Sequence, residues 1–251
     1  MQDLLLVDRS KICRERVFLI IPEKMRITKN IVTIMSALVF LGFQVAKAQT
    51  IRFERYEVNA VGVYASLVKI NGKEALMAVK DSGVTAFDAP TFVKIKGEDI
   101  TNGTIEVKVL SRLLKNAPEF SRGFIGIAFR INDSNTKYES IYIRPTNGRA
   151  DDQVRRNHSI QYYSYPDYKF DRLRKESPER YEAYADMELD KWITLRIEVK
   201  GAQAKLFLNN NEQPSLVVND LKHGANTAGA IALWVETGTE GYFRDLKVHK
   251  Q

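Results

Sequence analysis

The stretch KWITLRIEVKGAQAKLFLNN, residues 191–210, decides the fold class of this chain. Apolar residues occupy every second position in two runs: Ile193, Leu195, Ile197 and Val199, then Ala204, Leu206 and Leu208. A period of two is typical of a β-strand with one buried face. Because Gly201 and Ala202 supply a turn between the runs, the stretch is predicted to form two neighbouring strands.

The same period recurs through most of the chain, at 105–109, 125–131 and 231–235. Turn residues separate the runs, including Asn71-Gly72, Asn102-Gly103, Asn147-Gly148 and Thr237-Gly238. Many short strands with such punctuation predict an all-β fold, a two-sheet antiparallel jelly-roll sandwich. The roughly 200 residues of 49–251 fit a single domain of this kind.

The segment 165–190 has no clean period and is predicted to be an insertion in the sandwich. Ser177-Pro178 is a helix-start signal, with serine as N-cap and proline in the first turn. A short helix is therefore expected over about 178–185. A long insertion in a sandwich usually lies over one end or one face, where ligands are held.

The first 48 residues carry the pattern of an export signal. Basic residues follow Met25, then come a 13-residue apolar run at 31–43 and the cleavage motif Ala46-Lys47-Ala48. This order predicts a signal peptide over 25–48, and hence a secreted or periplasmic protein with no membrane span after cleavage. Residues 1–24 do not fit a signal peptide and are expected to be a mis-assigned or disordered extension.

The overall net charge of +7 does not point to nucleic acid. Residues 1–48 hold eight basic and four acidic residues, so the remainder has a net charge of only +3. No nucleic-acid partner is therefore expected. Cys13, the one cysteine, lies in the same segment. A single cysteine excludes an intrachain disulfide framework and a cysteine-rich zinc site.

The layout from Lys191 to Val248 resembles the C-terminal half of concanavalin A-like lectin and glucanase domains. Beyond the two strands described above, it contains 214–221, 229–235 and 241–248. The nearest likeness is to laminin G-like and 3-keto-disaccharide hydrolase-like bacterial secreted proteins. The resemblance implies a concanavalin A-like sandwich and a saccharide ligand, in a fold that hosts lectins, glycosidases, lyases and adhesion modules alike.

The stretch 144–165 is the strongest candidate for a site, because it combines arginines, aspartates, carboxamides, a histidine and tyrosines. Planar polar side chains bind pairs of sugar hydroxyls, and aromatic faces cover the C–H patches. The predicted sugar-orienting residues are Arg144, Asn147, Arg149 and Arg155. Asp152 and His158 are candidates to move a proton. A solvated loop with local charge pairs is the alternative.

Strand alternation also places a polar and aromatic set opposite the apolar residues: Arg130, Tyr142, Gln161, Tyr163, Trp234 and Glu236. If these side chains point into one concave sheet, they form a sugar-binding platform. Alternatively, Tyr142 and Trp234 belong to a second packed layer under the insertion. Glu139 shares the parity of Ile141, so it is either inward and paired or a catalytic acid in the site.

Adjacent Asp151 and Asp152 could ligate calcium, which takes oxygen ligands, and no other cofactor is predicted. The alternating carboxylates of 186–190 depart from the pattern of retaining glucanases, and we interpret them as a solvated edge. The sequence contains no P-loop, dinucleotide fingerprint, zincin motif or nucleophile elbow.

These observations predict a secreted protein that binds and processes a glycoside, as a 3-keto-glycoside hydrolase-like or lyase-like enzyme. One alternative is a non-catalytic carbohydrate-binding module that uses the same residues. A further alternative is an envelope domain whose arginine-rich segment binds a protein partner.

Overall fold

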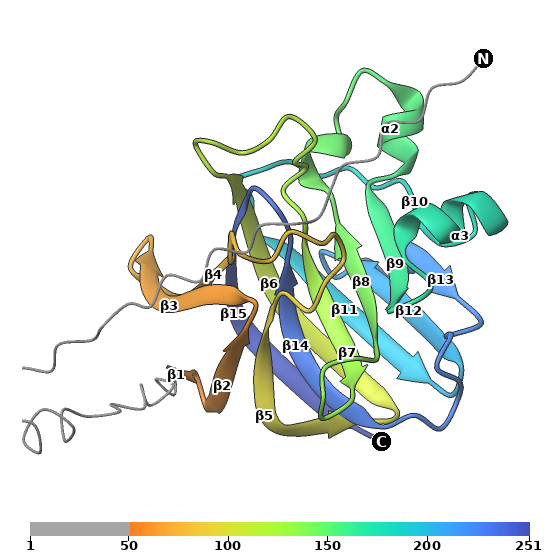
Figure 1. Ribbon diagram of the computed structural model, residues 1–251, viewed down its shortest axis with the longest axis horizontal. Helices are drawn as coiled ribbons and strands as arrows, with labels where there is room; N and C mark the ends of the chain where they lie inside the picture. Colours follow the sequence, from red (N-terminus) through yellow and green to blue (C-terminus); the bar gives the residue numbers. More distant parts are fainter. Residues whose placement is uncertain (1–50) are drawn as a thin grey trace, which may run out of the picture. The chain divides into compact units, whose positions relative to one another are not determined.

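A computed structural model describes residues 51–251 (Figure 1). The predicted extension at 1–24 and the predicted signal peptide at 25–48 lie outside the described residues. Residues 51–251 form two antiparallel sheets, with three short helical segments between strands. Within this range no helix is long and apolar enough to cross a membrane.

The first sheet has eight strands, and its neighbours pair antiparallel throughout. Their spatial order is β1 (Ile51–Phe53), β2 (Tyr56–Val61), β5 (Phe92–Ile100), β14 (Gly229–Val235), β7 (Ile125–Ile131), β8 (Tyr138–Ile143), β9 (Ile160–Tyr165) and β10 (Glu182–Ala183). The helical segments are η1 (Pro145–Asn147), α2 (Gln153–Asn157) and α3 (Phe170–Glu176). All three lie in the connections that flank β9.

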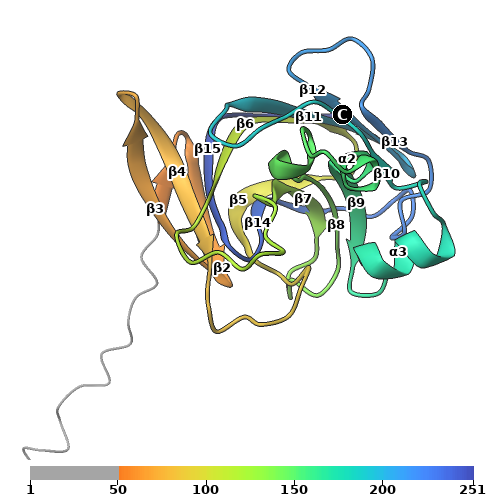
Figure 2. The same cartoon turned by 90° about the horizontal axis from the view of Figure 1, so that it is seen from above.

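The second sheet has seven strands, also antiparallel. Their order is β13 (Leu216–Val218), β12 (Gln203–Leu208), β11 (Ile193–Lys200), β6 (Gly103–Leu113), β15 (Thr239–Lys250), β4 (Lys73–Lys80) and β3 (Val63–Ile70). Seen from above, the two sheets curve around a common interior (Figure 2). The predicted all-β jelly-roll sandwich is confirmed, and every run with a period of two is a strand.

The interior explains why the alternating residues are apolar. Ile105, Ile197 and Leu233 are among the fully buried side chains of one continuous core. Burying such a side chain stabilises the fold by about 1.5–3 kcal/mol relative to leaving it in water. The alternation in the sequence therefore records which face of each strand meets the opposite sheet.

The central strands of the eight-stranded sheet are buried on both faces, which the alternation alone did not indicate. On the outer face, Trp234 packs against Tyr142 and Tyr163, with ring centroids 4.8 and 5.6 Å apart. Trp234 Nε1 donates to Ala89 O at 3.3 Å, so the connection at 81–91 covers this layer. These three rings form a second packed layer rather than an open platform.

The helix expected over 178–185 is wrong. The helix in the insertion is α3, and Ser177 ends it by donating its N–H to Leu173 O at 2.8 Å. Pro178 follows because proline cannot continue a helix. Glu182 and Ala183 then pair with β9 as strand β10, which fixes the insertion against the sheet edge.

Gly126 allows β7 to approach β8 closely. A Cβ atom at this position would lie 2.4 Å from Ile141 O and 2.5 Å from Tyr142 Cβ. We expect Gly126→Ala to lower the free energy of unfolding by about 1–3 kcal/mol, because the core must shift to admit it. Urea denaturation measures this, with Gly83→Ala as control since its Cβ would meet only the Asp81 side chain, at 3.3 Å. Equal stability of the two variants would contradict the prediction.

Candidate functional site

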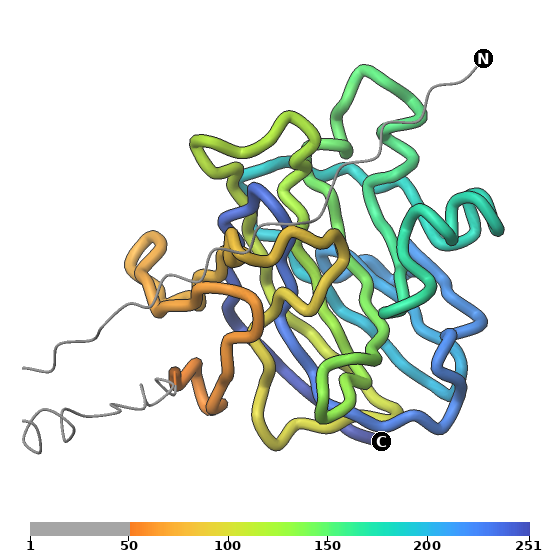
Figure 3. The backbone as a smooth tube through the Cα atoms, viewed as in Figure 1, coloured from red at the N-terminus to blue at the C-terminus, as the bar shows by residue number. Residues whose placement is uncertain are grey.

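A cavity of about 650 Å³ opens where β7 begins and β8 and β14 end. Ile125 is paired with both Ile143 and Val235, so the residues that flank these positions emerge together at one end of the sheet. The loops 81–91 and 114–124, the segment 144–158 and α3 complete the walls. The course of the backbone through these segments can be followed in Figure 3. The lining residues are Phe87, Asp88, Phe120, Arg122, Phe124, Tyr142, Arg144, Asn147, Asp152, Val154, Arg155, His158, Phe170, Arg174 and Glu236.

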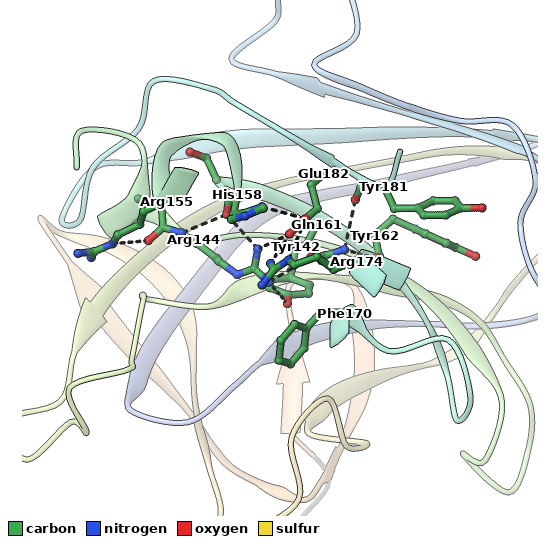
Figure 4. A network of polar contacts seen from close by, with 12 residues as sticks. Tyr142, Arg144, Arg155, His158, Gln161, Tyr162, Phe170, Arg174, Tyr181 and Glu182 are labelled. Atoms are coloured by element: carbon green, nitrogen blue, oxygen red, sulfur yellow. Dashed lines mark hydrogen bonds and ion pairs between the residues drawn. The ribbon is translucent and has the colours of Figure 1, made fainter. Parts of the chain in front are cut away.

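Arg144 leaves the end of β8 and enters a buried polar network (Figure 4). Its Nη2 donates to Tyr142 Oη at 2.7 Å and to Gln161 Oε1 at 3.2 Å. Its Nη1 donates to His158 O at 2.9 Å and lies 3.4 Å from Glu182 Oε1. Both Arg144 and Glu182 are almost fully buried, so the guanidinium is held in one position at the base of the cavity.

Glu182 is the centre of this network. It accepts from Arg174 through both carboxylate oxygens, with Arg174 Nε 3.1 Å from Oε2. Its Oε2 also lies 2.8 Å from His158 Nδ1, although off the direction of an Nδ1–H bond. A carboxylate carried by β10 thus fixes three basic side chains that come from β8, α3 and the end of α2. Glu182 therefore positions the basic side chains at this wall of the cavity.

His158 presents a neutral imidazole to the cavity near pH 7. Burial lowers the pKa of His158, and the positive charges of Arg174 and Arg144 lower it further, against the opposing effect of Glu182. A neutral imidazole can accept a hydrogen bond or a proton. His158 can therefore act on a bound ligand as an acceptor.

Asp88 is a buried carboxyl group in the loop 81–91, and it lines the same cavity. Burial raises the pKa of Asp88 to about 6, and the nearby charge of Glu236 adds to the rise. The Phe170 N–H, Arg144 and Lys169 oppose it. A carboxyl group with a pKa near 6 is ionised at neutral pH and still basic enough to take a proton.

Glu236 holds the loop that carries Asp88. Its Oε2 accepts from Asp88 N at 2.8 Å, and its Oε1 pairs with the Nζ of Lys80. Lys80 Nζ also donates to Ala86 O at 2.7 Å. Because Glu236 and Lys80 are both buried, the pair anchors 86–88 over the end of β14. Glu236 lines the cavity, but Lys80 neutralises it.

Hydrogen bonds within the segment 144–158 hold its cavity residues in place. Asp152 Oδ1 accepts from Arg155 N at 2.8 Å and so caps α2. Arg155 Nε donates to Asn147 Oδ1 at 2.9 Å, and Asn147 Nδ2 donates to His158 O at 3.1 Å. These bonds close the segment into a compact wall.

The structure brings together seven of the residues predicted to form a site: Tyr142, Arg144, Asn147, Asp152, Arg155, His158 and Glu236. Four others lie buried away from the cavity: Arg130, Gln161, Tyr163 and Trp234. Gln161 acts through Arg144, and Trp234 and Tyr163 form the packed aromatic layer. These three support the walls without reaching the space.

Arg130 is placed elsewhere because β7 is irregular at this position. Its φ of 54° coincides with the register shift between β7 and β14. Its guanidinium donates to the carbonyl oxygens of Thr101, Gly201 and Gly224, at 2.7–2.8 Å for the shortest bond to each. Arg130 therefore joins loops and does not bind in the cavity.

Glu139 is inward and paired, the first of its two predicted alternatives. It is fully buried, and its Oε2 accepts from Tyr162 Oη at 2.6 Å. Its Oε1 accepts from His223 N at 2.8 Å. Glu139 does not line the cavity, so the alternative role as an acid in the site is not supported by its position.

Arg149 is exposed and lies outside the cavity. Its guanidinium pairs with Asp186 at 2.8 Å and with Glu188 at 2.8 Å. The carboxylates of 186–190 are thus a solvated edge, as predicted. Asp151 is also exposed, and within residues 51–251 no three acidic, histidine or cysteine side chains gather into a metal site. Calcium binding by Asp151 and Asp152 stays a prediction.

Apart from Glu236, the aromatic and acidic residues of the cavity that lie outside 142–158 were not predicted from the sequence. Asp88 offered only a weak signal, an acidic residue between turn residues in a loop. Phe87 and Phe120 are half exposed and pack edge to face, with centroids 5.4 Å apart. Phe170 and Arg174 lie four residues apart on α3. This helix is too short to show a helical period in the sequence, so their shared face was not predicted.

The buried charge of Asp88 predicts a pH dependence of stability. The pKa of this carboxyl is about 6 when folded and 3.8 ordinarily, so folding favours its protonated form. The wild-type protein therefore loses up to about 3 kcal/mol of stability as pH rises from 4 to 7. We expect the stability of Asp88→Asn, relative to wild type, to rise by a similar amount over this range. Urea denaturation at both pH values measures it, and a constant difference would contradict the prediction.

Several solved structures are similar to this chain. Carbohydrate-binding module CBM66 from Bacillus subtilis shares 11% identity and a TM-score of 0.49, covering 76% of this chain and 96% of that chain. A protein with a galectin-like fold from Bacillus subtilis shares 11% identity and a TM-score of 0.47, covering 78% and 89%. Alginate lyase vAL-1 from Chlorella virus shares 12% identity and a TM-score of 0.43, covering 78% and 93%.

No curated protein matches the sequence. Residues 104–249 match a family described as the 3-keto-alpha-glucoside-1,2-lyase-like domain. The matched range is more than half of the 251 residues, and it runs from β6 to the end of β15. It includes every cavity residue except Phe87 and Asp88. The chain therefore belongs to the family of 3-keto-alpha-glucoside-1,2-lyase-like domains.

Proposed function

We propose that this protein binds a 3-keto-glycoside in the cavity and cleaves it by elimination across C1 and C2. One observation carries the proposal: the buried carboxyl of Asp88, with its pKa raised to about 6, faces the same cavity as Arg144 and a wall of aromatic rings. Family membership supports this reaction class, since the family is described as 3-keto-alpha-glucoside-1,2-lyase-like.

The chemistry needs one base and one positive charge. A ketone at C3 acidifies the C2–H bond, and the Asp88 carboxylate takes that proton. The charge that develops on the C3 oxygen is stabilised by the Arg144 guanidinium, which is buried and already fixed. The electron pair then forms the C1=C2 bond as the bond from C1 to the departing oxygen breaks. The proton passes from Asp88 to that oxygen, which restores the carboxylate.

The aromatic residues supply the binding surface. Phe170 begins α3 and lies beside both Arg144 and Arg174, whose guanidinium carbons are 5.9 and 5.4 Å from its ring centroid. Phe87 and Phe120 stand at the exposed part of the cavity. Aromatic faces pack against the C–H patches of a sugar ring, and polar side chains fix its orientation. The neutral His158 accepts from a sugar hydroxyl in this arrangement.

The test uses the full chain with an α-linked 3-keto-glucoside and its unoxidised parent glucoside. We expect release of the leaving alcohol from the 3-keto compound only, together with exchange of the C2 proton for deuterium in D₂O, followed by NMR. Exchange at C2 reports the base independently of leaving-group departure. Binding without exchange or release would favour a non-catalytic carbohydrate-binding module. No binding of either sugar would overturn the proposal.

A secreted or periplasmic location is part of the same proposal. It is supported by the order of basic, apolar and small residues within 25–48. Mass spectrometry of the native protein is expected to find an N-terminus directly after Ala48. An N-terminal peptide that contains Cys13 would exclude both the cleavage and a start at Met25.

A further inference from the structure

Two arginines of the cavity, Arg122 and Arg155, have only neutral hydrogen-bond partners. Arg122 Nη1 donates to the carbonyl oxygens of Glu119 and Ser121, at 2.5 and 2.9 Å. Arg155 donates to the side chains of Asn147 and Thr146, at 2.9 and 3.2 Å. Within residues 51–251, neither guanidinium has a carboxylate oxygen within 4.0 Å. We call these two residues the basic pair.

Both members of the basic pair bond to Thr146, Arg122 through its backbone carbonyl and Arg155 through its guanidinium. Thr146 N donates to Arg122 O at 3.3 Å, while Thr146 Oγ1 accepts from Arg155 Nη2 at 3.2 Å. The loop 114–124 and α2 therefore bring their arginines to one part of the cavity. In Figure 4 the Arg155 side chain extends away from Glu182 and Arg174. Glu182, which pairs with the cavity arginines Arg144 and Arg174, forms no ion pair with either member of the basic pair within residues 51–251.

The electrostatics of Arg122 agree with this geometry. Burial lowers the pKa of Arg122, and the positive charges of Arg155 and Arg144 lower it further, against the opposing negative charge of Glu119. Like charges held close together repel, and an anion between them relieves the repulsion. Guanidinium groups also bind carboxylates and phosphates through paired hydrogen bonds, which are about twice as strong as neutral ones.

We propose that the basic pair binds an anionic substituent, a carboxylate or a phosphate, on the sugar that occupies the cavity. This inference rests on the proposed function, because it assumes a saccharide ligand, and it narrows the substrate class to acidic sugars. The anion held by Arg122 and Arg155 would fix one end of the ring. The carboxylate of Asp88 would repel the same group from its own part of the cavity.

The test compares three ligands by calorimetry on the full chain: D-glucose, D-glucuronate and D-glucose 6-phosphate. We expect at least one of the two acidic sugars to bind about tenfold more tightly than glucose. Which of them binds more tightly identifies the anion as carboxylate or phosphate. Raising NaCl from about 50 to about 500 mM should weaken acidic-sugar binding several-fold and leave glucose binding unchanged.

Variants locate the effect. Arg122→Gln and Arg155→Gln should each reduce the preference for the acidic sugar to near one, while the affinity for glucose changes little. Arg149→Gln is the matched control, because this arginine lies in the same segment as Arg155 but outside the cavity. If a glutamine variant fails to fold, the salt dependence of the wild-type protein still tests whether an anionic group is bound by positive charge. Acidic-sugar binding that does not weaken with NaCl would overturn the inference.

Three outcomes separate this inference from the proposed function. A preference that persists in both glutamine variants overturns the role of the basic pair. Glucose binding equal to that of both acidic sugars also overturns it, and leaves the proposed function standing. Absence of binding by all three sugars overturns the inference, and absence of 3-keto-glucoside binding as well overturns the proposed function.

Discussion

Replacing Asp88 by asparagine is expected to lower kcat on a 3-keto-α-glucoside by about 10²–10⁴-fold, with a small change in KM. A positioned general base contributes a factor of this size, and asparagine cannot take a proton. The side chains have nearly the same shape, so Glu236 and the Phe170 N–H keep their contacts with residue 88. Loss of turnover with retained binding distinguishes a catalytic role from a structural one.

The pH dependence of the wild-type enzyme is a second test of Asp88 as the general base. Because the pKa of Asp88 is raised to about 6, kcat/KM in the wild type should rise as pH increases through that value. This limb should be absent from any residual activity of Asp88→Asn. If His158 were the base instead, the limb should persist in Asp88→Asn, because the titrating group would still be present.

Asp152→Asn is the matched control for Asp88→Asn. Asp152 lines the same cavity but is exposed, and asparagine replaces aspartate well as an N-cap, so α2 should persist. We expect its kcat to stay within about threefold of wild type. If Asp152→Asn abolishes turnover and Asp88→Asn does not, then Asp152 is the base and our assignment is wrong.

Replacing Glu182 by alanine is expected to lower the free energy of unfolding by about 3–5 kcal/mol. Removing one partner of a buried ion pair leaves the other charge buried and uncompensated. Arg144 is nearly fully buried and has no other carboxylate within 4.0 Å in the part of the chain that the structure describes. Arg174 is more exposed and can reach water, so Arg144 accounts for most of the loss.

Urea denaturation measures this loss, and Glu188→Ala is the control. Glu188 is also a carboxylate paired with an arginine and a lysine, but the partners are exposed, so we expect a loss below about 1 kcal/mol. NMR titration adds a local readout. Without Glu182 the pKa of His158 should fall further, because the one nearby negative charge that raises it is gone. Equal losses in the two variants would contradict the prediction.

Most of the candidate site that could be predicted from the sequence lies where the chain itself places residues together; Glu236, predicted from strand alternation, is the exception. Arg144, Asn147, Asp152, Arg155 and His158 lie within 15 positions, and the structure finds all of them on one cavity. A short polar segment between two strands can hardly fold so that these side chains separate widely. Arg149 is the exception, because its neighbours turn it outward toward Asp186 and Glu188.

Residues that reach the cavity from distant parts of the chain could not be predicted in the same way. Asp88 lies on a loop that is held in place by Glu236, 148 positions further along the chain, and by the ion pair of Glu236 with Lys80. Glu182 lies on a two-residue strand, which is too short to show a period in the sequence. Their roles depend on burial and on neighbouring charge, and both quantities exist only once the chain is folded.

The sequence by itself determined the fold class, because a period of two in apolar residues is a local property that each strand carries independently. It also predicted a site in the stretch 144–165, and the structure places residues of 144–158 in one wall of the cavity. Only the tertiary structure decided that Trp234 and Tyr163 are packed, since alternation shows which residues share a face but not what covers that face. Only tertiary burial raised the pKa of Asp88, because desolvation is produced by residues far away along the chain.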